Sequence, residues 1–587
     1  MAEQADGIQL DTIRFPDEAQ AVREEPCGRS FAFHSTHMDV QVSGEGDHTR
    51  YLMRVSNRGL AQHPLKIRFS TGRGLAYVPT WLHNPPVYDL KGAGFSFTHF
   101  GLPKRSGVGQ AAIPADLPLA ICFDPGTNPA CEMVACETVE KGVGLRLGDG
   151  GITFFFLDGT ERSSWAIEFH TVRGTGLIDC LRNYHRHVPY DGIRTDDAQM
   201  MWFYDDLANY GNEDGSYNLE GFRNDAATME ELGVKYVVIE PGHLSQHFDK
   251  RFWSPGMARH HPRMDFFVKS LDVLTDSSMA PLIYYNCVHG KVDLMTDPEY
   301  GTPDLHRLRY RAADGGLEQS RMQESMKIDM NWFKDGVVPT TEYPMDSDPV
   351  MEVRCAEWRD WLCRRITYML STYPQLAGTY VDTWPAGLPL FGESLTAYDD
   401  AYDENSWWNA VNDLMWDIRQ VTRSFEGKVL MLNDSRMPKK VMEAADIILN
   451  EDAGPIANPE RAFWHCLRSM AVGHGGKPGY QFHHAKPGMR NDVRARTVMA
   501  CAGGMGLGYC AIHFDHRHRE DSGDTKEAYN AALRDMKWIA EESAVGTPEI
   551  TMSGETRNIE SLVYSTDGHE VEIDFPANHV TVRRNRR

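Results

Sequence analysis

The chain has 587 residues, 41% of them hydrophobic and 10% aromatic, and its formal net charge is −23. This length exceeds one ordinary domain, so we expect two or three domains with large buried cores. The acidic balance argues against nucleic acid and against anionic membranes as partners, because a negative surface repels both.

The N-terminal stretch has no basic segment followed by an apolar one, so we expect no secretory signal. No run of 18 apolar residues occurs, which predicts that nothing spans a membrane. The 11 cysteines are scattered and form no Cys-x-x-Cys pair. Such an odd, unpatterned set is typical of reduced thiols, so we predict a cytoplasmic protein.

Residues 1–190 are predicted to form a β-sandwich. Apolar or alternating runs at 31–34, 51–55, 152–156 and 165–169 are separated by Gly, Asn, Asp and Pro turns. Short strands at this spacing are typical of a sandwich, and no long amphipathic helix interrupts the pattern.

Residues 195–542 alternate between strand and helix patterns. The predicted strands are 200–204, 234–239, 281–285, 377–381, 429–432, 446–449, 479–482 and 507–512. The clearest helical patterns are 219–232 before Gly233, 265–275, 351–371 and 525–541, and 290–348 is a long insertion. Eight strand–helix units predict a central (β/α)8 TIM barrel, because a doubly wound sheet carries fewer strands and a Gly-rich first turn.

Residues 546–587 return to strand alternation, as in 571–575, and predict a small C-terminal β-domain. The fold class is therefore multidomain, α/β plus β. Its predicted order is a sandwich, a barrel and a small β-domain.

Barrel enzymes carry their catalytic groups just beyond the carboxyl ends of the strands. Most predicted strands of this chain are followed there by carboxylates, imidazoles or amides. We expect this set to meet at one rim and to bind substrate: Asp205, Asp206, Glu240, His243, Asn286, Trp384, Asp434, His483, His513 and Asp515.

Glycoside hydrolysis needs two carboxyl groups across the scissile bond. Asp382 ends an apolar strand and suits the role of nucleophile or base. Asp452 or Glu451, after the sixth strand, can supply the acid, since the tips of strands 4 and 6 can face each other across a sugar. Asp434, after the fifth strand, lies between these strands and is the main alternative to Asp452 and Glu451 as the acid.

These placements resemble the α-galactosidase and α-glucosidase superfamily of retaining glycoside hydrolases, in which a β-sandwich precedes the barrel. The segments 378–384 (GTYVDTW), 449–454 (LNEDAG) and 229–242 carry the likeness. The resemblance implies that Asp382 is the nucleophile and Asp452 the acid/base. A related group, the α-N-acetylgalactosaminidases that act on mucin-type glycans, takes its acid/base as Glu, which keeps Glu451 open.

The chain departs from the superfamily pattern at two positions, and the usual motif of the sixth strand is also absent. Tyr380 stands where galactosidases carry Lys, and Glu240 stands where their second strand ends in Asp. We therefore interpret the chain as a divergent member or a separate family.

A histidine-rich run, 513–518, suggests rival functions. Zinc sites use His and carboxylate ligands, so a metal-dependent barrel hydrolase is one alternative. The His-x-His that such hydrolases carry after strand 1 is replaced here by Asp205-Asp206, and we predict neither a metal nor a cofactor. A polysaccharide lyase or sugar isomerase, and an inactive carbohydrate-binding protein, are two further candidate functions. The expected partner is an oligosaccharide or glycoside substrate, and the chain is compatible with a homo-oligomer.

Overall fold

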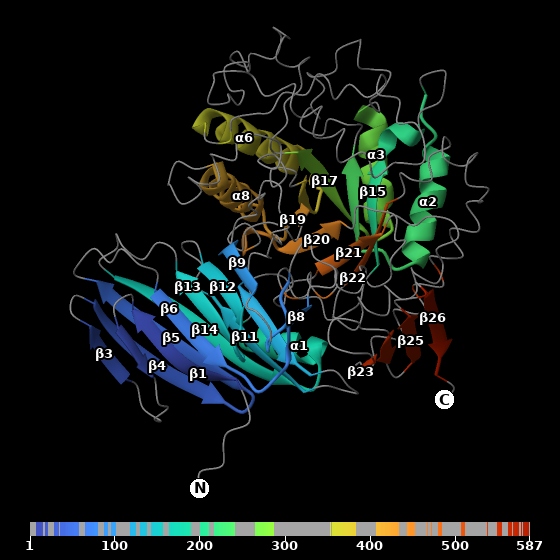
Figure 1. The fold of residues 1–587 in the computed structure, drawn as a ribbon. Coiled ribbons are helices and arrows are strands. Elements are labelled where there is room, and N and C mark those ends of the chain that lie inside the picture. The colour runs from blue at the N-terminus through green and yellow to red at the C-terminus, as the bar shows by residue number, and fades with distance from the viewer. Residues whose placement is uncertain are drawn as a thin grey trace, which may run out of the picture.

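The computed structural model arranges the chain as two stacked sheets, a closed barrel and a small C-terminal sheet (Figure 1). The structure describes residues 8–15, 18–21, 29–33, 36–57, 65–79, 87–91, 95–100, 118–124, 130–137, 143–156, 164–188, 200–210, 216–240, 264–286, 353, 355–382, 407–433, 443–451, 467, 471, 479–483, 506–510, 534, 537, 549–553, 561–565, 568–574, 577 and 579–585. The insertion 290–348 lies outside these residues. Among the described helices, none is long and apolar enough to cross a membrane.

The N-terminal part contains a six-stranded and an eight-stranded sheet. The first has the order β2-β1-β6-β13-β12-β9, and the second β3-β4-β5-β14-β11-β10-β7-β8. Their strands are β1 Gln9–Phe15, β2 Glu18–Ala21, β3 Arg29–Phe33, β4 Thr36–Glu45, β5 His48–Asn57, β6 Leu65–Ser70, β7 Leu75–Tyr77, β8 Val87–Asp89, β9 Phe95–Phe100, β10 Leu119–Phe123, β11 Cys131–Cys136, β12 Val143–Gly148, β13 Gly151–Phe156 and β14 Ser164–Gly174. Neighbouring strands within these sheets pair in antiparallel fashion, as in the predicted sandwich.

Alternating residues of both sheets meet in one core. Phe69, Phe154 and Phe169 form its aromatic centre, with ring centroids 5.0–6.0 Å apart. The opposite face of the eight-stranded sheet is also apolar and belongs to the core that it shares with the barrel. The part of this sheet formed by β7, β8, β10 and β11 is therefore buried on both faces, whereas β4 and β5 also carry exposed residues. Only one face of the six-stranded sheet enters a core.

One helix of this region was not expected from the sequence pattern. Helix α1, Leu177–His187, follows β14 directly and packs on β14 and β11. Its apolar residues Leu177, Leu181 and Tyr184 recur at helical spacing and are buried. The Cys180 thiol lies 3.7 Å from the Val172 carbonyl oxygen, so the helix is also anchored by a polar contact.

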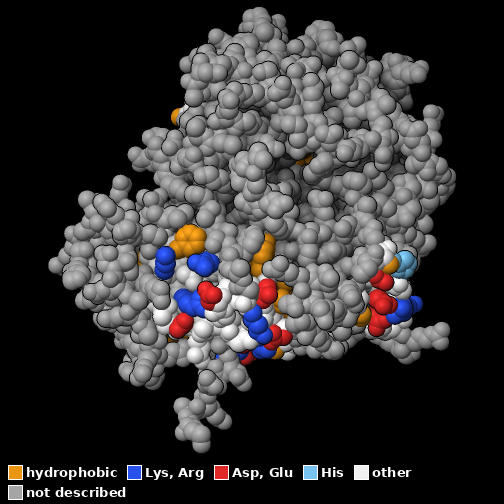
Figure 2. Space-filling view, viewed as in Figure 1, with side chains coloured by type: hydrophobic (Ala, Val, Ile, Leu, Met, Phe, Trp, Pro, Cys, Tyr) orange, Lys and Arg blue, Asp and Glu red, His pale blue; other side chains and the backbone are white. Residues whose placement is uncertain are grey.

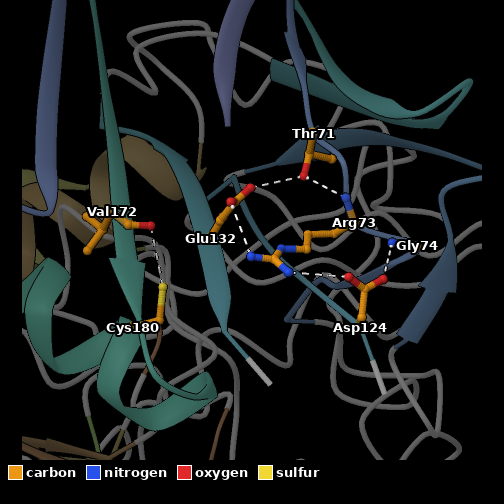
Figure 3. A network of polar contacts seen from close by, with 7 residues as sticks. All are labelled: Thr71, Arg73, Gly74, Asp124, Glu132, Val172 and Cys180. Carbon is orange, nitrogen blue, oxygen red and sulfur yellow. Dashed lines mark hydrogen bonds and ion pairs between the residues drawn. The ribbon is translucent and has the colours of Figure 1, made fainter. Parts of the chain in front are cut away.

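A polar network fixes the crossing from β6 to β7, where the chain changes sheets (Figure 3). The buried carboxylate of Glu132 accepts a hydrogen bond from the Thr71 hydroxyl at 3.1 Å and lies 3.5 Å from the Arg73 guanidinium. Arg73 also reaches Asp124 at 3.4 Å, and Asp124 accepts from the Gly74 amide at 2.8 Å. A buried carboxylate is tolerated here because it is both paired and hydrogen-bonded.

Eight parallel strands close into a barrel in chain order. They are β15 Met200–Asp206, β16 Tyr236–Glu240, β17 Ala280–Asn286, β18 Gly378–Asp382, β19 Val429–Asn433, β20 Ile447–Glu451, β21 Gly479–His483 and β22 Gly506–Cys510. The last strand pairs with the first, Met200 opposite Leu507, which closes the ring. Each predicted strand thus has its counterpart, with ends shifted by up to a few residues.

Helices follow the first four barrel strands. They are α2 Leu219–Glu231, α3 Met264–Asp276, α6 Ala356–Thr372 and α8 Trp407–Arg423, with a short 3-10 turn, Leu207–Tyr210, after β15. The connections after β19 to β22 lie largely outside the described residues. Two residues of the predicted final helix are described: Arg534 pairs with the Glu231 carboxylate at 2.5 Å, and Lys537 bonds the Glu231 carbonyl at 2.6 Å. The complete (β/α)8 plan and the three-domain division stay predictions.

The C-terminal sheet consists of β23 Glu549–Ser553, β24 Ser561–Ser565, β25 His569–Asp574 and β26 His579–Arg584, in that order. Its strands are antiparallel throughout. Arg583 on β26 pairs with Glu570 and Glu572 on β25, each at 2.8 Å.

Candidate active site at the mouth of the barrel

Side chains of β16 to β20 pack together in the interior of the barrel, so we place the candidate ligand site beyond the strand ends. Tyr236, Val238, Leu282, Tyr380, Val429, Met431, Ile447 and Leu449 form one buried cluster inside it. The Tyr284 ring packs against Tyr380 with centroids 5.5 Å apart. The residues between these positions, such as Ile239, Ile283 and Val381, belong instead to the core outside the barrel.

Strand β18 is held tightly against its neighbour. Gly378 has φ +158°, and a Cβ built on it would lie 2.0 Å from the Val429 carbonyl oxygen. The preceding helix α6 buries Trp358, Ile366 and Met369, and the Lys428 ammonium donates to the carbonyl of Pro374 at 2.8 Å and to that of Leu376. Asp382 is therefore carried by a strand whose start is fixed on both sides.

Polar residues occupy the carboxyl ends of seven of the barrel strands. They are Asp205 and Asp206 on β15, Glu240 on β16, Asn286 on β17, Asp382 on β18, Asn433 on β19, Glu451 on β20 and His483 on β21. The ladders pair Asp206 with Glu240 and Asn286 with Asp382. Because all eight strands run parallel, these ends meet at one edge of the barrel.

Five of these strand-end residues occupy equivalent positions on their strands. Glu240, Asn286, Asp382, Asn433 and Glu451 each follow, by two residues, a residue that packs inside the barrel. Successive residues of a strand alternate between its two faces, so these five positions fall on the face that is turned to the barrel interior. Asn433 is itself buried, at 3% exposure.

Several predicted site residues lie outside the described part of the chain. These are His243, Trp384, Asp434, Asp452, His513 and Asp515. Asn433, which the strand pattern places after the fifth strand beside Asp434, ends that strand. Its burial at the barrel mouth makes it a candidate, and the signal for it was its place directly after the run VLML.

At the opposite end of the barrel, where strands β19 and β20 begin, charged side chains are held by hydrogen bonds and an ion pair. Asp446, buried at 2% exposure, accepts from the Leu430 amide at 2.9 Å and from Arg423 at 3.0 Å. Arg419 donates to the carbonyls of Glu443 and Ala444, at 2.5 and 2.9 Å. These charged groups are satisfied by the protein itself, as is typical of the face opposite a barrel active site. Among the described residues, no group of three or more His, Cys, Asp or Glu could hold a metal ion.

No family model and no curated protein matches the sequence. Solved structures do match the fold. An α-galactosidase from Lactobacillus brevis is 11% identical with a TM-score of 0.52, covering 97% of this chain and 76% of that one. A cycloalternan-forming enzyme from Listeria monocytogenes, in complex with a pentasaccharide substrate, is 9% identical with a TM-score of 0.51, covering 96% and 56%. A GH36 α-galactosidase from Geobacillus stearothermophilus, in complex with 1-deoxygalactonojirimycin, is 11% identical with a TM-score of 0.50, covering 97% and 79%.

At these identities the likeness concerns the fold alone. It extends over nearly the whole chain, the sandwich as well as the barrel. In overall architecture the chain resembles the α-galactosidases and related glycoside hydrolases.

Proposed function

We propose that the chain is a glycoside hydrolase that cleaves an α-linked glycosidic bond at the mouth of its barrel. Asp382 is the proposed nucleophile, and Glu451 or Asp452 the acid/base. The observation that carries the proposal is the position of two carboxyl residues, Asp382 and Glu451, at the ends of β18 and β20 on one edge of a closed barrel. The likeness in fold to α-galactosidases supports the same function.

The spacing of these strands suits the chemistry. Neighbouring strands lie about 4.8 Å apart, so the backbones of β18 and β20 are separated by roughly 10 Å. Carboxyl groups that extend toward each other across this gap can flank one glycosidic bond. A retaining enzyme needs the two groups about 5–5.5 Å apart, and an inverting enzyme leaves room for a water at about 6.5–9.5 Å. We propose retention, in line with the resemblance of the segments around Asp382 and Glu451.

The roles of the two carboxyl residues differ in the reaction. The Asp382 carboxylate attacks the anomeric carbon while the acid protonates the leaving oxygen, which gives a glycosyl ester and a free alcohol. The same acid then acts as base toward water, and hydrolysis of the ester restores Asp382. We assign Glu240, Asn286 and Asp206 to the sugar hydroxyls, since their strand ends lie at the same edge of the barrel.

The first experiment is a screen of nitrophenyl glycosides in both anomeric forms, followed by NMR of the first product anomer. On an accepted substrate, Asp382→Asn should lower kcat on the order of 10⁴-fold while the protein stays folded. Azide should rescue Asp382→Ala by forming a glycosyl azide of inverted configuration. Unchanged turnover in Asp382→Asn would end the assignment of this residue as nucleophile.

A second experiment separates Glu451 from Asp452. Loss of the acid is tolerated when the leaving group needs no proton. The true acid variant, Glu451→Gln or Asp452→Asn, should therefore keep a nearly normal kcat/KM for a dinitrophenyl glycoside, because kcat/KM reports the first step, and should lose most of its kcat/KM for an alkyl glycoside. The other variant should treat both substrates alike. If neither variant separates the two leaving groups, the acid does not come from β20.

A further inference from the structure

The six-stranded sheet turns one face away from the sandwich core, and that face carries an aromatic side chain among cations. Ile67, Leu145 and Phe154 point into the core, so the residues between them lie on the outer face. The register places Lys66 and Gly144 on either side of Phe155, and Arg68 and Arg146 on either side of Thr153. We call the set Lys66, Arg68, Arg146, Thr153 and Phe155 the platform.

The ring of Phe155 lies directly over Gly144. A Cβ built on Gly144 would stand 2.0 Å from two ring carbons, so the ring occupies the space that a side chain would need. Phe155 is only half-buried, although every core phenylalanine described on the same sheet is buried. A ring seated on glycine and still reachable by solvent offers a surface for the C–H face of a sugar.

The cations around this ring differ in how they are held. Arg68 donates to the Asp11 carboxylate at 3.1 Å and to the Asp149 carbonyl at 2.6 Å, which fixes its guanidinium on the sheet. Lys66 and Arg146 are exposed, and no carboxylate of the described residues pairs with either. Figure 2 shows this face with Lys and Arg side chains gathered beside a hydrophobic group over the six-stranded sheet.

Charge complementarity indicates the occupant. A chain of net charge −23 places two exposed cations, with no carboxylate partner among the described residues, and a half-buried aromatic ring together on one face. The guanidinium fork of Arg146 matches the two oxygens of a carboxylate, and Lys66 supplies a second positive charge. The acidic chain repels any polyanion, but a carboxylated sugar polymer has a lower charge density than nucleic acid and so meets less repulsion, and its ring faces can stack on Phe155.

We propose that the platform binds an acidic glycan, a polysaccharide whose sugar rings carry carboxylate groups. The bound sugar stacks on Phe155, and its carboxylate lies between Lys66 and Arg146. This surface belongs to the sandwich and uses no residue of the barrel mouth. It therefore goes beyond the proposed hydrolase activity and does not depend on it.

The test is calorimetric titration of the full chain, carrying Asp382→Asn so that nothing is cleaved, with polygalacturonate oligomers at low salt. The same oligomers with methyl-esterified carboxyl groups are the neutral comparison. Lys66→Glu, Arg146→Glu and Phe155→Ala should each weaken binding about tenfold. Arg54→Glu makes the same charge change at an exposed position of the other sheet and should leave binding within about twofold.

The proposal is supported if the acidic oligomers bind the parent protein but bind the platform variants more weakly, and if the esterified oligomers bind weakly. It is overturned if wild-type affinity for the two ligands is equal, or if Arg54→Glu weakens binding as strongly as Arg146→Glu. Dextran sulfate or DNA that binds as tightly as polygalacturonate would also overturn it, because binding would then depend on negative charge alone and not on a carboxylated sugar. Melting temperatures of the variants establish that each is folded. Turnover of nitrophenyl glycosides by the platform variants without Asp382→Asn reports on the hydrolase proposal separately.

Discussion

Asn286 and Asp382 are register partners at the last pair of the β17–β18 ladder. Both follow, by two residues, a tyrosine of the barrel interior, and the rings of Tyr284 and Tyr380 are in contact below them. An amide and a carboxylate thus occupy neighbouring positions, on the inward face of adjacent strands, at the proposed substrate site. An uncharged amide beside Asp382, the proposed nucleophile, leaves the carboxylate free to ionise.

The first prediction concerns this pair. In Asn286→Asp a second carboxylate stands beside Asp382 and disfavours its ionisation, so the acidic limb of the kcat/KM profile should move up by about one pH unit. Asn286→Ala should lower kcat/KM about 10- to 100-fold without moving that limb. The measurement is the pH dependence of kcat/KM on an accepted nitrophenyl glycoside. Asn224→Asp, at an exposed position of α2, is the control, and an unmoved limb in Asn286→Asp would contradict the pairing.

The second prediction concerns Gly378, whose φ of +158° and contact with Val429 set the start of β18. Gly378→Ala places a methyl group against a backbone carbonyl, so β18 and β19 must separate. We expect a loss of about 3 kcal/mol or more in the free energy of unfolding, measured by urea denaturation. Gly72→Ala, with nothing within 4 Å of its added Cβ, should change stability by less than about 0.5 kcal/mol. Equal effects of the two substitutions would show that β18 does not depend on the close approach.

The third prediction concerns a histidine stack on the outer face of the eight-stranded sheet. The His48 ring lies between His187 at 4.1 Å and His170 at 5.1 Å, and His48 and His170 share a hydrogen bond of 2.8 Å. His170 is bonded in turn to Glu168, which holds Arg50 through two contacts of 2.6 and 2.8 Å. Burial lowers the pKa of His48 to about 4, and the neighbouring His187 and His170 add to the effect, with Arg50 lowering and Glu168 raising it.

The sign of the pH effect follows from this lowered pKa. The unfolded chain takes up a proton at His48 near pH 6.5, while the folded chain does so only near pH 4. Stability is therefore complete above about pH 6.5 and falls as the pH drops toward 4. Since His48 is partly exposed, we expect a loss of about 1–2 kcal/mol after allowing for solvent screening. Burial also lowers the pKa of His170, which acts in the same direction.

The measurement is the free energy of unfolding at pH 7.5 and pH 4.5 for the wild type and His48→Gln. The variant should lose less stability between these pH values than the wild type, because it has no proton to take up at this position. His579→Gln, at an exposed site of the C-terminal sheet, should follow the wild type. Parallel pH curves for the wild type and His48→Gln would contradict the prediction.

The local pattern of the sequence was sufficient for most of the barrel strands. Each is a short apolar run bounded by polar or glycine residues, so burial on both faces could be predicted without tertiary information. The end of helix α2 was predictable for a similar reason: Gly233 has φ +74°, a conformation that glycine adopts without strain. The polar residues at seven of the strand ends followed from the same runs, and Asn286 and Asp382 end β17 and β18 as the pattern predicts.

Strand ends and packing faces were decided by the tertiary structure. The sixth strand is predicted over 446–449, but the pairing of Glu451 with Phe482 extends it to Glu451. That residue then occupies a position on the inward face of the strand. Asp446 stands directly before the strand: its backbone amide donates to the Leu430 carbonyl at 2.8 Å, and its carboxylate accepts from the Leu430 amide and from Arg423. Helix α1 has apolar residues at helical spacing but only 11 residues, and a helix this short depends on its packing against β14 and β11.

The order of the amino acids predicts which residues form short buried strands and which polar residues follow them, because these properties depend on neighbours along the chain. Only the tertiary structure decided that Phe155 covers Gly144 between Lys66 and Arg146, and that Asp382 stands opposite Asn286. Those relationships depend on the register between strands. Register is set by how whole sheets pack and close, which no single segment specifies.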